Sequence, residues 1–261
     1  SGGGGTGADG GLLFDGPQGE VESISVEPAT TTIDVVNGTS TPAQFKAVGK
    51  LKTGGTTTVP ATWAFDRLDL AVISAGGSLK AHGSKGGTGT VTATFGALTA
   101  TATATIALKL EDDSAGLTAA DKAKFATPDS NPSGTLLYPY DKTVFARGIL
   151  APELMWSGGA AGDKYKLEIV DKAVTLTAFF AADPPSRFVM KKDWWTALTE
   201  SSDGSAVSVK LSRLDAAGTA HQAMAQTWKI APGSLRGTIY YWAVNLGQIV
   251  KINPGASAPV P

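Results

Sequence analysis

The sequence predicts an all-β protein built from two β-sandwich modules in tandem. Residues 87–109 alternate threonine with small apolar residues around a Phe95-Gly96-Ala97 turn, which is typical of a hairpin with one buried face. Short apolar runs separated by Gly, Pro and Asn turns recur along much of the chain. The chain has 261 residues, 42% of them hydrophobic, which is enough for two domains with cores.

The first module is expected over residues 20–110. Residues 20–36 alternate as two short strands, and Pro28 between them suits a strand that changes sheets or bulges. The alternation around Phe45 places that ring in the core. Two turns and a further strand are expected before the next motif: Asn37-Gly38, Gly54-Gly55 and residues 56–59.

The segment that follows, residues 61–96, resembles a known family. Its motifs are Thr62-Trp63, Ala71-Val72-Ile73-Ser74, a turn at Gly77, residues 79–81 and a closing hairpin strand at 88–94. In this order they resemble the group 2 bacterial Ig-like domains, over about residues 20–110. The resemblance implies a seven-stranded sandwich without the cysteine pair of antibody domains. The absence of cysteine from the sequence agrees with it.

Residues 111–133 are expected to form a linker with one or two helical turns. Thr118 is the candidate N-cap, and Asp121 stands at the capping-box position. The β pattern returns over residues 134–253, which form the second predicted module, and residues 254–261 are expected to be a C-terminal tail.

The second module resembles the fibronectin type III-like modules of secreted bacterial proteins. The resemblance rests on Leu154-Met155-Trp156, on the alternation of Tyr165, Leu167 and Ile169, and on the segment 227–245. It implies a second sandwich. A short helix is expected at 193–200, and strands at 206–214, 221–230 and 237–244. Within the last of these, Tyr240-Tyr241-Trp242 alternates across a strand, so one of its faces is expected to be core.

The N-terminal residues 1–19 are rich in glycine and are expected to be a flexible tether. They look like the segment that follows the lipidated cysteine of a bacterial lipoprotein, and the alternatives are an expression linker or a truncation. The lipoprotein interpretation predicts an extracellular or outer-membrane location, with the periplasm as the alternative. Apolar runs are too short to span a bilayer, so membrane contact is expected only through an N-terminal lipid anchor.

Composition argues against several classes of function. The net charge of −1 offers no basic surface for nucleic acid, and the absence of cysteine removes thiolate sites. The only two histidines, His82 and His221, stand far apart and are expected at the surface. Glu153 and Glu168 show no spacing that places them across a cleft. The sequence therefore predicts no enzyme.

No cofactor is expected either. Glu111, Asp112 and Asp113, with Asp129 and Asn131, form the densest groups of oxygen ligands, so Ca²⁺ at the linker is the alternative considered. No calcium-loop motif accompanies them. A solvated acidic linker is therefore the preferred interpretation.

The candidate binding residues are aromatic: Trp194, Trp195, Phe180 and Phe188. The tryptophan pair has the most exposed appearance, and exposed aromatic rings stack on sugars or anchor protein interfaces. The alternative is structural, with one tryptophan plugging the end of a sandwich and the other covering its edge.

Together these features predict a non-enzymatic cell-surface or secreted module for adhesion, spacing or assembly. Its expected partner is another surface protein, a copy of itself or a polysaccharide. Two alternatives stay open at this point. One is a carbohydrate-binding accessory module that uses the tryptophan pair, and the other is the non-catalytic N-terminal part of a larger hydrolase or propeller protein.

Overall fold

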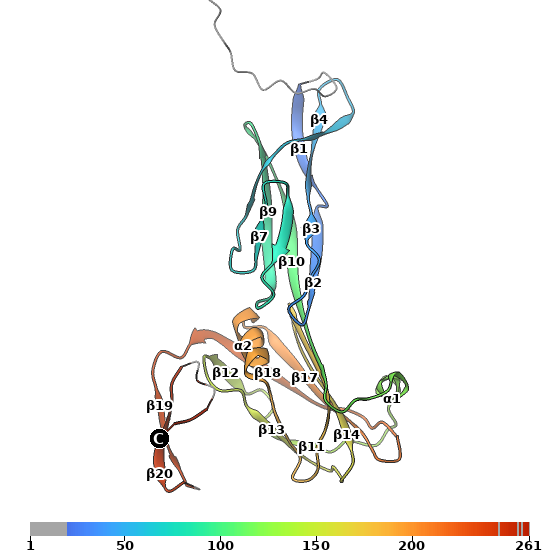
Figure 1. Ribbon diagram of the computed structural model, residues 1–261, viewed down its shortest axis with the longest axis vertical. Coiled ribbons are helices and arrows are strands. Elements are labelled where there is room, and N and C mark those ends of the chain that lie inside the picture. Colours follow the sequence, from blue (N-terminus) through green and yellow to red (C-terminus); the bar gives the residue numbers. More distant parts are fainter. Residues whose placement is uncertain (1–19, 245, 255, 257, 261) are drawn as a thin grey trace, which may run out of the picture.

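The computed structural model of the chain describes residues 20–244, 246–254, 256 and 258–260. The predicted tether at 1–19 lies outside the described residues. Within the described part, strands dominate and the helices are short, which confirms the all-β prediction. Figure 1 shows two halves stacked along the long axis, an upper half built before residue 113 and a lower half built after it.

The upper half places three sheets around a shared core. The sheets β1-β4-β5 and β3-β8-β7 pack on the β2, β10, β9 and β6 strands of a nine-stranded sheet. Its strands are β1 (Val21–Glu27), β2 (Thr30–Val36), β3 (Ala43–Gln44), β4 (Lys46–Leu51), β5 (Thr56–Val59), β6 (Thr62–Phe65), β7 (Ala71–Ile73), β8 (Ser78–Ala81), β9 (Gly87–Phe95) and β10 (Leu98–Asp113).

Several predictions for this half are confirmed. β9 and β10 form the expected hairpin, with Phe95 opposite Leu98, and their alanines and aliphatic side chains point inward while the threonines line the outer face. Pro28 separates β1, which pairs with β4, from β2, which pairs with β10, so the chain changes sheets there. The Phe45 ring is buried.

The lower half continues the nine-stranded sheet through β12, β18, β17, β14 and β15, and adds the sheet β11-β13-β16. Tyr165, Leu167 and Ile169 are all buried, as predicted. Its elements are α1 (Ala119–Lys124), β11 (Thr135–Tyr138), β12 (Val144–Arg147), β13 (Glu153–Ser157), β14 (Lys164–Asp171), β15 (Val174–Ala181), β16 (Arg187–Val189), α2 (Lys192–Ser201), β17 (Ala206–Leu214), β18 (Met224–Ser234), β19 (Ile239–Ala243) and β20 (Gln248–Ile252).

Helix α1 begins as the sequence predicts. The Thr118 side chain caps it by accepting a hydrogen bond from the Asp121 backbone N–H at 3.1 Å. The predicted helix at 193–200 is confirmed as α2, and the strand predicted at 206–214 has those bounds in β17.

One strand, β10, belongs to both halves. One of its edges pairs with β2 over residues 103–109. The other edge pairs with β9 as far as Ile106 and then with β15 from Leu108 onward. Leu108 therefore lies between Val35 of the upper half and Val174 of the lower half.

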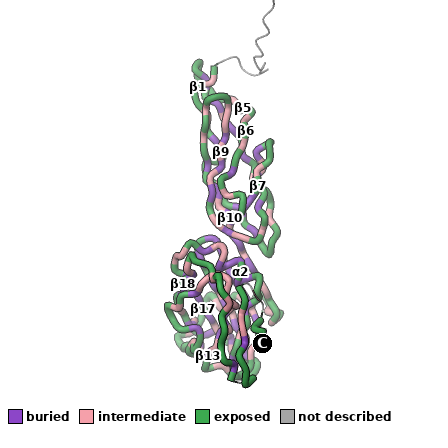
Figure 2. Tube along the Cα trace, turned by 90° about the vertical axis from the view of Figure 1, so that its left-hand side faces the viewer, coloured by how far each residue is buried: buried purple, intermediate pink, exposed green. Residues whose placement is uncertain are grey.

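The shared strand changes the expected organisation. β10 runs to Asp113, past the predicted module end at residue 110, and the buried side chains of both halves form one continuous cluster. The expectation of two separately closed cores is wrong, because the inward face of β10 continues without interruption from Ala102 to Leu110. Figure 2 shows buried residues along the strands of both halves. The division into domains stays a prediction.

The prediction that Tyr240-Tyr241-Trp242 contributes a core face is wrong. The three side chains are 67%, 40% and 59% exposed. β19 pairs with β20, and the only extensive contact that either strand makes within the described chain is with the other. No second sheet is placed to cover their aromatic rings. Figure 1 shows this hairpin at the lower left.

The backbone is tightly packed where β10 changes partners. A Cβ atom on Gly86 would lie 2.5 Å from the carbonyl oxygen of Ala173 and 3.1 Å from that of Ile106. Both obstacles are backbone atoms, one in the turn between β14 and β15 and one in β10, and they cannot rotate away as a side chain can. Glycine is therefore required at this position by the close approach of the two halves.

We expect Gly86→Ala to lower the free energy of unfolding by about 1–3 kcal/mol, because the added methyl group must push back the backbone of the β14–β15 turn and of β10. The measurement is urea denaturation of the full chain, followed by circular dichroism. Gly76→Ala is the matched control, since the nearest atom to its Cβ would be the Ser74 hydroxyl oxygen at 3.9 Å. Equal stability of the two variants would contradict this account of the junction.

Candidate functional site

The predicted tryptophan pair lies on α2, at the junction of the two halves. Trp195 is 3% exposed; its Nε1 donates a hydrogen bond to the Ile149 carbonyl oxygen at 2.9 Å, and its ring meets the Phe145 ring edge-on. Trp194 is 8% exposed, and the Lys191 ammonium lies 5.3 Å from its ring centroid. The expectation that this pair is exposed is therefore wrong, because α2 turns both rings toward the protein.

The two phenylalanines belong to a different aromatic group. Phe180 of β15 is buried against Tyr165 and Trp156, and its ring centroid is 4.3 Å from that of half-buried Phe188 on β16. Phe180 and Phe188 thus contact each other, and Trp195 contacts a different ring, that of Phe145. Stacking on a sugar needs an open ring face, so their burial argues for the structural alternative. A binding role for them stays a prediction.

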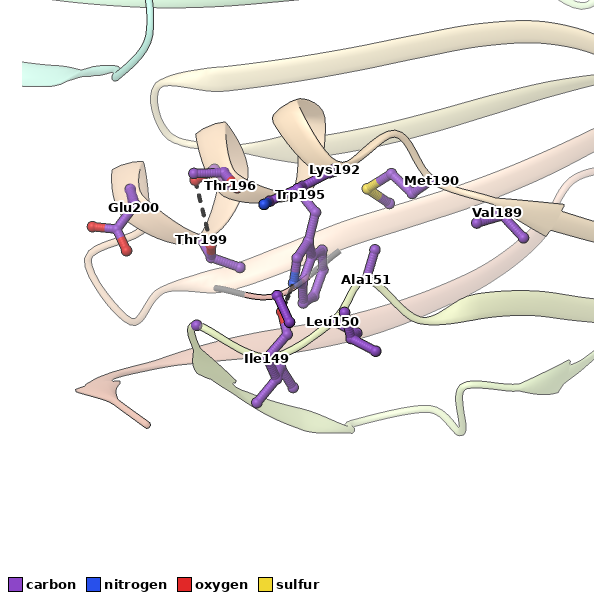
Figure 3. A pocket seen from close by; sticks show the side chains of 12 residues that line it. Ile149, Leu150, Ala151, Val189, Met190, Lys192, Trp195, Thr196, Thr199 and Glu200 are labelled. Atoms are coloured by element: carbon purple, nitrogen blue, oxygen red, sulfur yellow. Dashed lines mark hydrogen bonds between the residues drawn. The ribbon is translucent and has the colours of Figure 1, made fainter. Parts of the chain in front are cut away.

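A cavity of about 490 Å³ opens beside Trp195 (Figure 3). The apolar side of the wall comes from Ile149, Leu150 and Ala151, in the segment between β12 and β13. Its charged groups, Lys192 and Glu200, come from α2. They are eight positions apart, about 12 Å along the helix axis, so they do not converge on one point. The cavity could admit a small apolar group but holds no paired acid and base.

His221 is the titratable group that the sequence placed wrongly. It was expected at the surface, yet it is 7% exposed. Nδ1 lies 3.0 Å from Asp129 Oδ1, and Nε2 lies 3.1 Å from Asp215 Oδ2. Carboxylates only accept, so the two hydrogen bonds are made together only when both ring nitrogens carry a proton. The other histidine, His82, is exposed as predicted.

This cluster is a structural tie and not a catalytic triad. Both ring nitrogens of His221 are occupied by carboxylates, which leaves neither to activate a nucleophile. The nearby hydroxyl of Ser133 is fully buried and donates to the His221 carbonyl oxygen at 3.1 Å. The contacts fasten the segment after α1 to the β17–β18 turn.

Two of the acidic groups considered for metal binding, Asp112 and Asp113, are paired with lysines. Asp112 Oδ1 lies 2.6 Å from Lys191 Nζ, and Asp113 Oδ2 lies 2.8 Å from Lys122 Nζ. In the described part of the chain, no group of three His, Asp or Glu side chains is arranged so that it could hold a metal ion, and this includes the His221 cluster. These pairs tie the end of β10 to the elements around it.

The two glutamates considered for hydrolysis are partly exposed and ion-paired. Glu153 pairs with Arg187 at 2.9 Å, and Glu168 pairs with Lys166 at 2.7 Å. Each carboxylate is held by a lysine or arginine from its own sheet, so neither is positioned as a free acid or base. Among the described residues, no helix is long and apolar enough to cross a bilayer.

Comparisons with known proteins give no family. A scan against family models finds no match, and a search of curated proteins finds none. Among solved structures, domains 4 and 5 of the S-layer protein SbsC are 9% identical with a TM-score of 0.27, covering 81% of this chain and 99% of that one. The fibronectin(III)-like modules of Clostridium thermocellum CbhA are 11% identical with a TM-score of 0.26, covering 82% and 95%.

Tandem Ig domains of titin are 12% identical with a TM-score of 0.23, covering 81% of this chain and 96% of that one. Ig and fibronectin(III)-like modules, the two kinds that the sequence resembles, are thus among the structures found. TM-scores this low support no transfer of function. The resemblance to particular families stays a prediction.

We expect His221→Ala to lower the free energy of unfolding by about 1–3 kcal/mol, because it removes one hydrogen bond from each of two carboxylates. Thermal unfolding of the full chain measures the change. His82→Ala serves as the control, and we expect its effect to stay within about 0.5 kcal/mol because that side chain is exposed. If His221→Ala left the thermal unfolding unchanged, the hydrogen bonds of His221 would contribute nothing to the stability of the fold.

The same cluster predicts an acid-sensitive fold. The backbone N–H of Thr219 and the His221 ring hold the pKa of Asp215 below its usual value. Burial acts to raise the pKa of Asp129, but hydrogen bonds from Asn131 and His221 outweigh it, and the pKa is lowered. A carboxyl with a lowered pKa stabilises the fold above its unfolded pKa, and that stability is lost as pH falls through the folded pKa.

We therefore expect the urea midpoint to fall as the pH is lowered below about 4. The double variant Asp129→Asn, Asp215→Asn lacks both titrating groups and should show a shallower fall over the same range. Other ion-paired carboxyls are unchanged between the two proteins and cancel in the comparison. If the urea midpoint fell equally with pH in the two proteins, Asp129 and Asp215 would not be the source of the acid sensitivity.

Proposed function

We propose that this protein is a non-enzymatic surface module that holds two sandwich bodies at a fixed separation and orientation. The observation that supports this role is the single strand β10, which pairs with strands of both halves. In a tandem array joined by a flexible linker, each body moves independently. Here the hydrogen-bonded sheet itself passes from one body to the other.

Side-chain contacts reinforce the junction. The Gly86 N–H donates to Ser201 Oγ at 2.8 Å, which joins the loop before β9 to the end of α2. The Lys191–Asp112 ion pair joins the start of α2 to β10. Because these contacts hold both ends of α2 to the upper half and the shared strand, we expect bending at the junction to strain at least one of them.

The proposed location is extracellular, and the proposed partners are another surface protein, a copy of this chain or a polysaccharide. A rigid spacer presents such a contact surface at a set distance from its attachment. This role needs stable geometry and no reacting groups. The ion-paired acids and the fully engaged His221 suit it.

The test is the distance between the halves in solution. The chain has no cysteine, so Thr58→Cys in β5 and Lys210→Cys in β17 give two unique sites for spin labels. Because the shared strand fixes the geometry, we expect one narrow distance peak by double electron–electron resonance. A broad or multiple distribution would contradict the spacer role. On intact producing cells, Thr58→Cys should also react with a membrane-impermeant maleimide.

Two further variants separate junction rigidity from general stability. Lys191→Ala with Ser201→Ala removes side-chain contacts across the junction and should broaden the peak. Ser25→Ala with Lys46→Ala removes a hydroxyl and a lysine of the same kinds within the upper half, and should leave the width unchanged.

A further inference from the structure

The hairpin β19–β20 carries an unusual group of exposed side chains. Cross-strand partners share a face, so Tyr240 and Trp242 lie on the same side as their partners Lys251 and Ile249. Trp242 and Ile249 are 59% and 61% exposed. We call the exposed apolar residues of this face and of the turn the hairpin patch: Tyr240, Trp242, Val244, Leu246 and Ile249.

The kinds of side chain in the patch change with distance from the tip of the hairpin. Val244 and Leu246, in the turn, are 83% and 58% exposed and purely aliphatic. Trp242 stands two residues behind Val244, about 7 Å along the strand, and Tyr240 with Lys251 stands about 7 Å farther back. The sequence from the tip is thus aliphatic, then aromatic, then cationic.

The side-chain charges of the C-terminal segment that carries the patch have one sign. No Asp or Glu follows Asp215 in the sequence, and the cations of that stretch are Lys229, Arg236 and Lys251. Lys251 lies in β20, and Arg236 lies just before β19. A second copy of the hairpin would bring the same cations and no acid to pair with them. An anionic surface complements this segment.

Two backbone N–H groups of the turn, those of Leu246 and Gly247, are hydrogen-bonded within it. The Leu246 N–H donates to the Ala243 carbonyl oxygen at 3.0 Å, and the Gly247 N–H donates to the same oxygen at 2.9 Å. Transfer of unpaired backbone N–H groups into hydrocarbon is costly, so this bonding lowers the cost of burying the tip in lipid.

We propose that the hairpin patch docks on an anionic lipid bilayer. The tip residues Val244 and Leu246 enter the edge of the hydrocarbon, at the depth of 5–10 Å typical of interfacial segments. Trp242 and Tyr240 lie at the headgroup boundary, where amphipathic rings are favoured. Lys251 and Arg236 stay among the anionic headgroups. This contact is independent of the spacer role and adds a second membrane contact to the lipid anchor expected from the sequence.

The test is flotation of the full chain with two kinds of vesicle. One is phosphatidylcholine alone, and the other is phosphatidylcholine mixed with phosphatidylglycerol, both at low salt. We expect association with the anionic vesicles and weaker association with the neutral ones. The variant Trp242→Ser, Val244→Ser, Leu246→Ser should lower the partition coefficient by about tenfold or more, because the buried apolar area is removed.

The matched control replaces three equally exposed apolar residues elsewhere: Leu68→Ser, Tyr140→Ser and Val189→Ser, whose side chains are 69%, 74% and 68% exposed. It should bind vesicles as the unchanged protein does. Both triple variants should keep the thermal transition of the unchanged protein, since the hairpin contacts mainly itself. Arg236→Glu with Lys251→Glu should abolish the preference for the anionic vesicles.

Four results would overturn the proposal. One is no flotation of the unchanged protein with anionic vesicles. Another is equal flotation of the hairpin variant and the control. The third is a concentration-dependent dimer in sedimentation velocity that the hairpin variant abolishes, in the absence of vesicle binding, which would assign the patch to a second copy of the chain. Binding to soluble polyglutamate without vesicle binding would likewise exclude a bilayer.

Discussion

The structure depends on the pairing of β10 with strands from both halves. Nine residues of this strand, Leu98 to Ile106, pair with β9 in the upper half, and its last residues pair with β15 of the lower half. Leu108, between Val35 and Val174, is buried from both directions. Because β10 is hydrogen-bonded to strands of both halves, a displacement of the backbone in one half is transmitted to the other through the sheet. No flexible connection separates the two at this strand.

Local patterns in the sequence predicted the strands and turns well. The threonine–alanine alternation gave the β9–β10 hairpin, and Thr118 with Asp121 gave the start of α1, because each depends on neighbouring residues. The partner exchange along β10 could not be predicted this way. It depends on Val174, more than sixty residues away, and on Gly86, whose need for a small residue arises from the approach of Ala173 and Ile106.

At the candidate site, too, local sequence patterns did not predict contacts with distant parts of the chain. Trp194 and Trp195 looked exposed because charged residues precede them, but amphipathic α2 buries both. Tyr240, Tyr241 and Trp242 looked like core because they alternate with period two, yet no second sheet covers them. Alternation reports that a strand has two faces; which face is covered depends on elements elsewhere in the chain. His221 was missed because its partner Asp129 is ninety-two positions away.

The direction of β10 also has a mechanical consequence. β10 runs along the long axis of the molecule, and it is parallel both to β2 and to β15 (Figure 1). A pull along that axis would load these ladders in shear, so that many backbone hydrogen bonds resist at once and cannot open one after another. A protein that joins two bodies at a surface under flow or traction would therefore withstand tension at its junction, where a flexible connection would simply extend.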